Sequence, residues 1–456
     1  MGAAGARWSR ERGRACGFPP PAYPHGVSAP PGVPLPKGVL GARLAAPCGT
    51  ILPVAQGKPS HERTVTRPAG GLAFASARAS VLLFCAVTFL FWASLYLYVP
   101  VLPVHAEALG ASLSMVGAVI AAYAIPQLLL RIPVGVWADA LGRRKPLVLG
   151  GAVTAAAGAL ALGLAPGPWP LFLGRALTGV AAATWVAFTV LFASYYPGER
   201  AARAIGLISF VNGAALVAAT SAGGAIAQVW GFKAAFFGAA ALAAGALVAL
   251  LPVREPPVRA PRGVSWGGFL RVAGQPVLLL ASGMSVLVHF ASYAGVLGFL
   301  PVYAARLGAS AAALGVLTML ALGSAAGAAL GAIYAVERWG YPRAIALGAL
   351  LLGGALLSVP FIGQVAWLGV AQVVNGLGRG LLMTVLMALS IRAVAPQERA
   401  TAMGVYQALY SVGMLAGPLA SGVLAERLGL ASVFYISAAL CLVLVVVARA
   451  PALPRR

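Results

Sequence analysis

The chain has 456 residues, of which 61% are hydrophobic and only 9% are charged. Soluble domains carry about 25% charged residues, so this composition and a mean hydropathy of +0.91 exclude a conventional water-facing surface and indicate an integral membrane protein. The net charge of +23 does not indicate nucleic-acid binding, because most basic residues after residue 78 lie in short segments between apolar stretches. The four cysteines are far apart, which excludes a disulfide scaffold and the usual metal or redox spacings.

The N-terminal region differs from the rest of the chain. Residues 1–77 contain twelve of the 33 prolines and many glycines. They include no apolar run long enough for the core of a signal peptide. This composition predicts a disordered tail over 1–78. An alternative is that translation starts downstream, so that part of this segment is absent from the mature protein.

Apolar stretches of about 20 residues follow one another from residue 79 onward, which is the length that a bilayer core demands. The predicted spans are 79–100, 113–137, 146–165, 169–193, 201–229, 232–252, 275–302, 311–336, 342–362, 366–393, 400–427 and 430–449. This pattern predicts an all-α membrane protein with twelve transmembrane helices. They form two six-helix bundles, at 79–253 and 274–450, with a cytoplasmic linker at 254–273 and a short tail at 451–456.

The two sets of spans are related by an internal repeat. Segment 102–112 returns as 300–310, a shift of 198 residues, and 197–201 returns as 396–400, a shift of 199. Duplication of a set of membrane spans predicts two pseudo-symmetric bundles that can rock about a shared central cavity.

The basic residues predict how the chain is oriented in the membrane. After residue 78, sixteen Lys and Arg residues lie on one set of alternate loops and at the C-terminal end, against three on the opposite set. By the positive-inside rule, this bias predicts a multi-pass protein of the plasma membrane with both termini in the cytoplasm.

A charged motif lies between the second and third predicted spans. It contains Gly135, Asp139, Gly142, Arg143 and Arg144, followed by Lys145 and Pro146. The spacing resembles the signature loop of the major facilitator superfamily, G-x-x-x-D-x-x-G-R-(R/K)-(R/K), which that family carries at the same place. The duplicated six-span halves resemble the family too, so the resemblance extends from residue 79 to about 450.

The resemblance implies a secondary transporter that works by alternating access, similar to the drug/proton antiporter-like bacterial efflux branch. It also implies that Asp139 and Arg143 belong to a conformational latch, which faces the eleventh span and keeps the cytoplasmic side closed in the outward-facing state. Gly135 would allow close helix approach, and Gly142 would allow a tight turn. The alternative is that three consecutive cations serve only as a topology signal.

Two other segments resemble patterns of proton-coupled members of that family. Arg175 and Gly179 match R-x-x-x-G in the fourth span, and 413–422 in the eleventh span reads as the antiporter pattern G-x-x-x-G-P-x-x-x-G. In antiporters the latter pattern is diagnostic in the fifth span, where this chain has Ala219 and Thr220 in place of Gly-Pro. This departure weakens the expectation of antiport.

Charged residues well inside the spans, away from their ends, are all basic. Arg131, Arg175 and Arg379 lie within spans, His289 is the only imidazole well inside one, and none of the nine acidic residues lies mid-membrane. Buried charges in membrane helices mark functional sites, and arginines without a carboxylate suit an anionic or polar substrate. Proton coupling would then use His289, Asp139 or the substrate itself.

Polar and aromatic residues near these charges complete the predicted substrate cavity. A stripe at intervals of four residues along the second span consists of Tyr123, Gln127, Arg131, Gly135 and Asp139. The aromatic candidates are Trp92, Tyr96, Tyr293, Tyr406 and Tyr410, with Ser292 and Gln407 beside them. Packing between helices is the alternative for each of these side chains.

The predicted function is secondary active transport of a small molecule, with proton-coupled efflux of a drug-like or metabolite substrate as the first expectation. Uptake or facilitated transport of a small organic anion is one alternative, and a non-transporting membrane receptor or scaffold is another. The chain has no paired carboxylates, nucleophile–base set, metal cluster or phosphate-binding loop. We therefore predict no enzyme activity, metal, cofactor or nucleic-acid partner; the expected partners are the substrate, protons and the lipid bilayer, with the protein as a monomer.

Overall fold

The computed structural model describes residues 70–196, 200–256, 266–392, 394–395, 398–449 and 453, without the side chains of 70–78, 139–140, 201–202 and 400. All of them belong to one compact unit, residues 67–456. Residues 1–69 of the predicted disordered tail (1–78) therefore lie outside the described residues. Helix α1 begins at Gly70, whereas its apolar, membrane-length part begins at Ala79.

The regular secondary structure in the first half of the described chain is entirely helical. The helices are α1 (Gly70–Tyr96), α2 (Leu102–Ala108), α3 (Leu113–Ala122), α4 (Ala124–Leu141), α5 (Lys145–Leu164), α6 (Pro168–Ala183), α7 (Trp185–Ala193), α8 (Ala201–Trp230) and α9 (Phe232–Leu250). The second and fourth predicted spans are each broken once, at Tyr123 between α3 and α4 and at Thr184 between α6 and α7.

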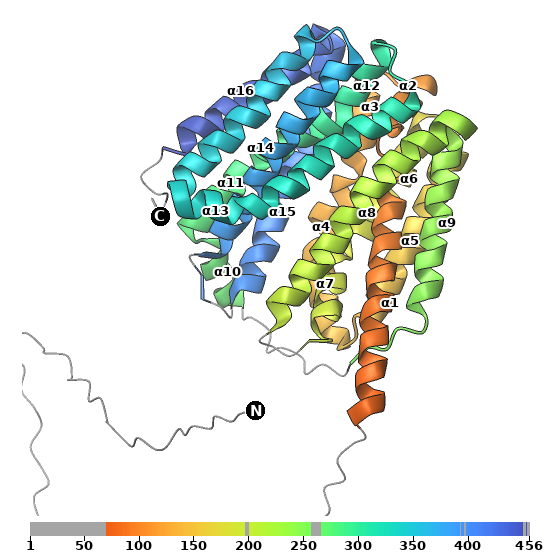
Figure 1. The fold of residues 1–456 in the computed structure, drawn as a ribbon, viewed down its shortest axis with the longest axis vertical. Helices are drawn as coiled ribbons and strands as arrows, with labels where there is room; N and C mark the ends of the chain where they lie inside the picture. Colours follow the sequence, from red (N-terminus) through yellow and green to blue (C-terminus); the bar gives the residue numbers. More distant parts are fainter. Residues whose placement is uncertain are drawn as a thin grey trace, which may run out of the picture. The chain divides into compact units, whose positions relative to one another are not determined.

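The second half repeats this plan with different local breaks. Its elements are α10 (Trp266–Ala273), α11 (Pro276–Ala291), the π-helix η2 (Ser292–Phe299), α12 (Leu300–Arg306), α13 (Ala311–Ser358), the 3-10 turn η3 (Val359–Phe361), α14 (Val365–Arg392), α15 (Arg399–Leu428) and α16 (Ala431–Val447). Figure 1 shows the helices of the first half gathered on one side and those of the second half on the other.

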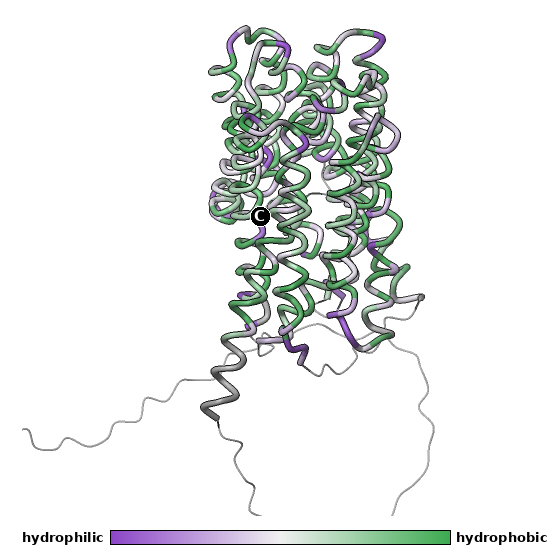
Figure 2. Tube along the Cα trace, turned by 90° about the vertical axis from the view of Figure 1, so that its right-hand side faces the viewer, coloured by the Kyte–Doolittle hydropathy of each residue, from purple (hydrophilic) through white to green (hydrophobic). Residues whose placement is uncertain are grey.

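Ten helical segments of the described residues are long and apolar enough to cross a membrane. One of them, Ala311–Phe361, contains Gly340 with non-helical angles (φ 80°, ψ 166°), so α13 includes two of the predicted spans. Helix α16 is a shorter apolar helix of 17 residues. Figure 2 shows that hydrophobic residues predominate along the helices. The predicted all-α membrane fold is confirmed, and the twelfth span rests on this short last helix.

Glycines with left-handed backbone angles confirm the internal repeat. The six positive-φ glycines in the described part form three pairs, each related by 198 residues: Gly110 with Gly308, Gly142 with Gly340, and Gly231 with Gly429. Residues other than glycine rarely adopt a backbone conformation with positive φ. The two halves therefore turn at equivalent points, including the loop of the charged motif at Gly142.

Within each half, small residues let neighbouring helices approach closely, as is usual for helices that pack in lipid. In the second half, an added Cβ at Gly380 would overlap the backbone carbonyl of Ala325, so α14 lies directly against α13 there. In the first half, aromatic rings fill the space between α1 and α7, where Phe91 and Phe188 have ring centroids 4.6 Å apart.

We expect Gly380→Ala to lower the melting temperature of the protein in detergent. The new methyl group forces α13 and α14 apart, and overpacking of this kind costs about 1–3 kcal/mol. Gly354→Ala on α13 is the matched control, because nothing lies within 4 Å of a Cβ added there and alanine favours helix by roughly 0.5–1 kcal/mol. Equal melting temperatures for the two variants would contradict the proposed close packing.

Candidate functional site

The loops between the membrane-spanning helices lie at two ends of the protein. We call these the basic end and the opposite end. The basic end carries the turn at Gly142, the connection that ends at Arg200 and the turn at Gly340. The opposite end carries the turns at Gly110, Gly231, Gly308 and Gly429. In Figure 1 the opposite end is uppermost and α10 lies toward the basic end.

At the opposite end the two halves are in direct backbone contact. A Cβ on Gly117 of α3 would overlap the carbonyl oxygen of Pro418 on α15. On the other side of the protein, a Cβ on Gly224 of α8 would lie 2.7 Å from the Cα of Gly315 on α13. Two pairs of helices, α3 with α15 and α8 with α13, therefore join the halves along glycine seams at this end.

Polar contacts reinforce the opposite end. The Glu426 carboxylate accepts a hydrogen bond at 3.0 Å from the backbone N–H of Ser114, in the first turn of α3. Arg306 forms an ion pair with Glu107, at 3.0 Å, between the equivalent helices α12 and α2. An exposed pair of this kind contributes little stability in water, so we treat it as a marker of contact between the halves.

Toward the basic end the glycines of the same spans make no such close contact. An added Cβ at Gly135 of α4, Gly206 of α8, Gly331 of α13 or Gly404 of α15 would meet no described atom within 4 Å. The close glycine contacts between the second and eleventh spans, and between the fifth and eighth, are thus found toward the opposite end and are not repeated at these four glycines. The close helix approach predicted at Gly135 stays a prediction.

Arg131 links the two halves between these ends. Its guanidinium donates hydrogen bonds to Gln127 Oε1 at 2.7 Å on its own helix, and to Gln407 Oε1 at 2.9 Å and the Tyr410 hydroxyl at 2.6 Å on α15. Gln127 in turn donates to the Tyr123 carbonyl at 3.0 Å. Arg131, in the middle of the predicted stripe on the second span, therefore faces the other half of the protein. Arg131 is 8% exposed.

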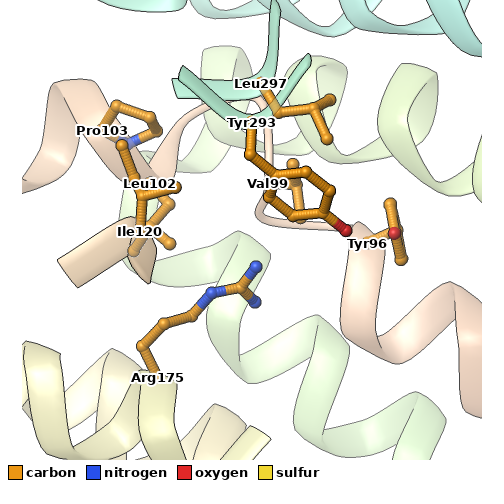
Figure 3. Close-up of a pocket in the computed structure, with 8 residues that line it drawn as sticks. All are labelled: Tyr96, Val99, Leu102, Pro103, Ile120, Arg175, Tyr293 and Leu297. Carbon is orange, nitrogen blue, oxygen red and sulfur yellow. The ribbon is translucent and has the colours of Figure 1, made fainter. Parts of the chain in front are cut away.

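Arg175 lies at the end of a small pocket. Its guanidinium carbon is 4.1 Å from the centre of the Tyr123 ring, and it donates a hydrogen bond to the Tyr98 hydroxyl at 3.1 Å. Figure 3 shows the guanidinium directed toward Tyr96 and Tyr293. The pocket has a volume of about 10 Å³, which is room for roughly one water molecule. The pocket is therefore too small to hold a substrate in this arrangement.

His289 stacks on an aromatic ring of the eleventh span. Its ring is parallel to that of Tyr410, with centroids 4.1 Å apart and an interplanar angle of 2°. Its Nδ1 lies 2.8 Å from the Ser285 carbonyl oxygen, and Ser285 Oγ lies 2.9 Å from the Tyr406 hydroxyl. His289, Tyr406 and Tyr410 are thus brought together, as a shared pocket would require.

Arg379 and Trp92 occupy different positions in this region. Arg379 is partly buried, interacts electrostatically with Tyr96, Tyr293 and His289, and makes no hydrogen bond with any described residue. Trp92 packs at right angles on Trp185, with centroids 5.2 Å apart, in the first half. The structure therefore gathers most of the predicted cavity residues, and Trp92 lies beside them as a packing residue.

We name seven of these residues the central cluster: Arg131, Arg175, Arg379, His289, Tyr96, Tyr293 and Tyr410. Placing an arginine in the middle of a membrane helix costs about 2.5–3.5 kcal/mol by insertion scales. The described carboxylates are Glu107, Glu255, Glu337, Glu398 and Glu426, and none of them pairs with an arginine of this cluster. Amides, hydroxyls and aromatic rings are the partners instead.

The residues of the charged motif lie at the basic end. Arg143 is exposed, whereas Arg144 is buried. The side chain of Asp139 lies outside the described residues, so the latch predicted for Asp139 and Arg143 stays a prediction. It concerns a state in which the basic end is closed.

One residue at this end was not found from the sequence. The Glu255 carboxylate accepts hydrogen bonds from the backbone N–H groups of Arg144 and Lys145, and so caps the first turn of α5. A carboxylate at a helix N-terminus is favoured by the unpaired N–H groups and by the helix dipole. Because Glu255 is about 110 residues from the helix that it caps, only the folded chain brings the two together.

The neighbouring Tyr195 takes part in the same contacts. Its hydroxyl donates to the Arg254 carbonyl at 2.6 Å. Burial, and then the negative charge of Glu255, raise the pKa of Tyr195 to about 12. The hydroxyl is therefore protonated at neutral pH and remains a donor. At the opposite end, burial and the nearby Lys233 lower the pKa of His105, which packs on Phe236 as a neutral ring.

Two repeated sets of apolar helices, joined at one end and meeting at a buried polar cluster, define a multi-pass membrane transporter. The family model for the Major Facilitator Superfamily matches residues 84–364 and 283–455. The chain belongs to this superfamily, and the resemblance inferred from the charged motif is confirmed.

Curated relatives support the efflux branch of the family. Multidrug resistance protein MdtG of Enterobacter lignolyticus (strain SCF1) is 25% identical over 366 residues, covering 77% of this chain and 86% of that protein. Tetracycline resistance protein, class C, of Escherichia coli is 29% identical over 349 residues, covering 71% and 84%. Inner membrane transport protein YajR of Escherichia coli (strain K12) is 30% identical over 190 residues, which is only 41% of either chain.

Solved structures share the fold at lower identity. A mutant of the nucleoside transporter NupG has a TM-score of 0.70 at 15% identity, covering 82% of this chain and 98% of that chain. A bacterial homolog of the human lysosomal transporter Spinster, in an inward-facing and unoccupied conformation, has a TM-score of 0.69 at 18% identity, covering 82% and 95%. These likenesses concern the fold alone.

We expect Glu255→Ala to destabilise the basic end by about 0.5–2 kcal/mol, the usual cost of losing a helix N-cap. Glu255→Gln should be milder, since a neutral oxygen can still accept one hydrogen bond. Glu337→Ala, which removes an exposed carboxylate on α13, is the matched control. Thermal unfolding in detergent measures the effect, and a melting temperature for Glu255→Ala equal to that of Glu337→Ala would contradict the capping role.

Proposed function

We propose that this protein exports small molecules from the cytoplasm by alternating access. The positive-inside rule assigns the basic end to the cytoplasm. On that assignment, the observed arrangement corresponds to a state that is closed toward the outside and ready to accept a substrate from the cytoplasm. The proposal is carried by the contrast between the two ends of the same four helices, which a non-transporting receptor or scaffold does not require.

The direction of transport is supported by the names of the relatives. MdtG and the class C tetracycline resistance protein are named for resistance, and PmrA of Streptococcus pneumoniae, 26% identical over 358 residues, is named a multi-drug resistance efflux pump. Resistance to a compound follows when it is removed from the cell. Export of a small organic molecule is therefore the direction that we propose for this chain.

Proton coupling, predicted from the resemblance, needs a side chain that exchanges protons near the substrate. Among the side chains described here, the central cluster has no carboxylate, and His289 is its only imidazole. Coupling within the cluster therefore depends on His289. The remaining candidates are Asp139, near the basic end of the second span, and the substrate itself.

Flux into or out of proteoliposomes tests the proposal. We expect the purified protein to move at least one small organic compound faster than empty liposomes do, in a screen that includes the cation ethidium and the anion fluorescein. Imposing a pH gradient with the voltage held at zero separates the driving forces. Stimulation that His289→Gln removes would establish proton coupling through His289, whereas indifference to the gradient would exclude proton coupling. Absence of flux for every compound would contradict transport.

We expect Asp139→Asn to slow transport while leaving substrate binding intact, because the predicted latch closes the cytoplasmic side and does not contact the substrate. Glu337→Gln removes an exposed carboxylate of α13 toward the basic end, and this charge control should transport as the wild type does. Turnover and binding are measured on the same preparation. Unchanged turnover in Asp139→Asn would remove the latch from the account.

A further inference from the structure

Three arginines reach the interior of the protein at successive depths. Arg175 on α6, Arg379 on α14 and Arg131 on the second span lie on helices that begin at the opposite end. At a rise of 1.5 Å per residue, they are about 10, 21 and 27 Å along their helices from that end. The guanidinium groups are therefore spread along the direction in which a substrate would move.

The three arginines act electrostatically on shared neighbours. Tyr96 interacts with both Arg175 and Arg379, and His289 interacts with both Arg379 and Arg131. Arg379 is thus near enough to influence the same side chains, Tyr96 and His289, that the other two arginines influence. Helices from both halves of the protein contribute to the group.

Arg131 and Arg175 are buried, and their partners are neutral. Arg131 contacts two amides and one hydroxyl, and Arg175 contacts hydroxyls and the faces of two tyrosine rings. Their Nε–H groups, although buried, have no acceptor among the described residues. These neighbours orient the guanidiniums without cancelling their charge.

Arg379 is held in place by its neighbours along the helix. Gly378 lies against the backbone of Gly348 and Leu352, and Gly380 lies against the backbone of Ala325, so α14 is pressed onto α13 on both sides of Arg379. The face of α14 that carries Arg379 is consequently turned away from α13, toward Tyr96, Tyr293 and His289. Its buried Nε–H has no acceptor among the described residues.

We infer that the central cluster binds an organic anion, specifically an aromatic carboxylate or sulfonate, with Arg379 as its main charge partner; this rests on the transport function proposed above. A guanidinium can donate two parallel hydrogen bonds to such a group. The rings of Tyr96, Tyr293 and Tyr410 supply surfaces on which an aromatic part can stack. The bound anion supplies the negative charge that the described side chains of the cluster lack.

The charge of an anionic substrate also provides a driving force for its export. Exporting a monoanion from a cell whose interior is negative moves charge down the membrane potential. Such a transporter can concentrate its substrate outside without a protonatable carboxylate in the site. The arginines at successive depths offer the anion a partner at each stage of the path, from Arg131 near the basic end to Arg175 near the closed end.

A charge series on one ring system tests the inference on the wild-type protein. Naphthalene-2-sulfonate, its neutral sulfonamide and 2-naphthyltrimethylammonium are compared by equilibrium dialysis with purified protein in nanodiscs, with no gradient present. We expect the sulfonate to bind at least tenfold more tightly than the cation, with the sulfonamide between them. Tighter binding of the cation, equal affinities or no binding of the sulfonate would overturn the inference.

Variants then assign the charge partner. We expect Arg379→Gln to weaken sulfonate binding about tenfold or more while changing sulfonamide binding little, and Arg379→Lys to recover part of the loss. Arg427→Gln removes an exposed arginine near the opposite end and should bind as the wild type does. Equal loss for both ligands in Arg379→Gln would indicate a structural defect and overturn the assignment of Arg379.

The two proposals fail separately. Sulfonate binding without flux in proteoliposomes would refute the transport function and leave the anion site in place. Flux of ethidium together with failure to bind the sulfonate would leave the transport function in place and refute the anion site.

Discussion

The compensation of positive charge inside the membrane-spanning helices is the constraint that organises this protein. Arginine in such a helix is costly, and each of the central arginines contacts or interacts with residues on other helices. Arg131 reaches from the second span to Gln407 and Tyr410 of the eleventh span, so its compensation requires both halves. The polar cluster therefore lies where the halves meet, and any relative movement of the halves changes the surroundings of its arginines.

In the proposed transport cycle, the glycine seams are the contacts between the halves that must separate when the opposite end opens. Backbone contacts at Gly117 and at Gly224 join the halves toward the opposite end, whereas a Cβ added at Gly135 or Gly206 would meet no described atom within 4 Å. Such contacts have little side-chain entropy to lose and are sensitive to a single methyl group. Motion that opens one end can therefore close the other while the fold within each half is preserved. The Glu255 cap stays within the first half, where it fixes the start of α5.

Much of the fold could be predicted from the sequence. The spans follow from apolar length, and their observed boundaries lie within a few residues of prediction, as with Lys145–Leu164 for 146–165. The repeat is visible in both sequence and backbone, because glycine is required at the same turns of both halves. The breaks at Tyr123 and Thr184 and the π-helix Ser292–Phe299 could not be predicted, because tertiary packing decides these local distortions and hydrophobic length does not.

The candidate site was predictable in part and for a physical reason. Arginine in an apolar helix is conspicuous at the level of sequence, so Arg131, Arg175 and Arg379 were found at once. Their partners were less specific, because Gln407 and Tyr410 resemble ordinary packing residues until the second and eleventh spans are placed side by side. Glu255 lies in a loop with no motif, and its role depends on a contact about 110 residues away.

The account's central claim is that the two ends open in alternation around the arginine cluster. Pairs of spin labels measure this directly: Val229 with Leu428 at the opposite end, and Leu141 with Arg399 at the basic end, all four exposed. During turnover of a transported compound, the account predicts that the first distance lengthens in the same molecules in which the second shortens. Lengthening at both ends together, or movement at one end alone, would contradict it.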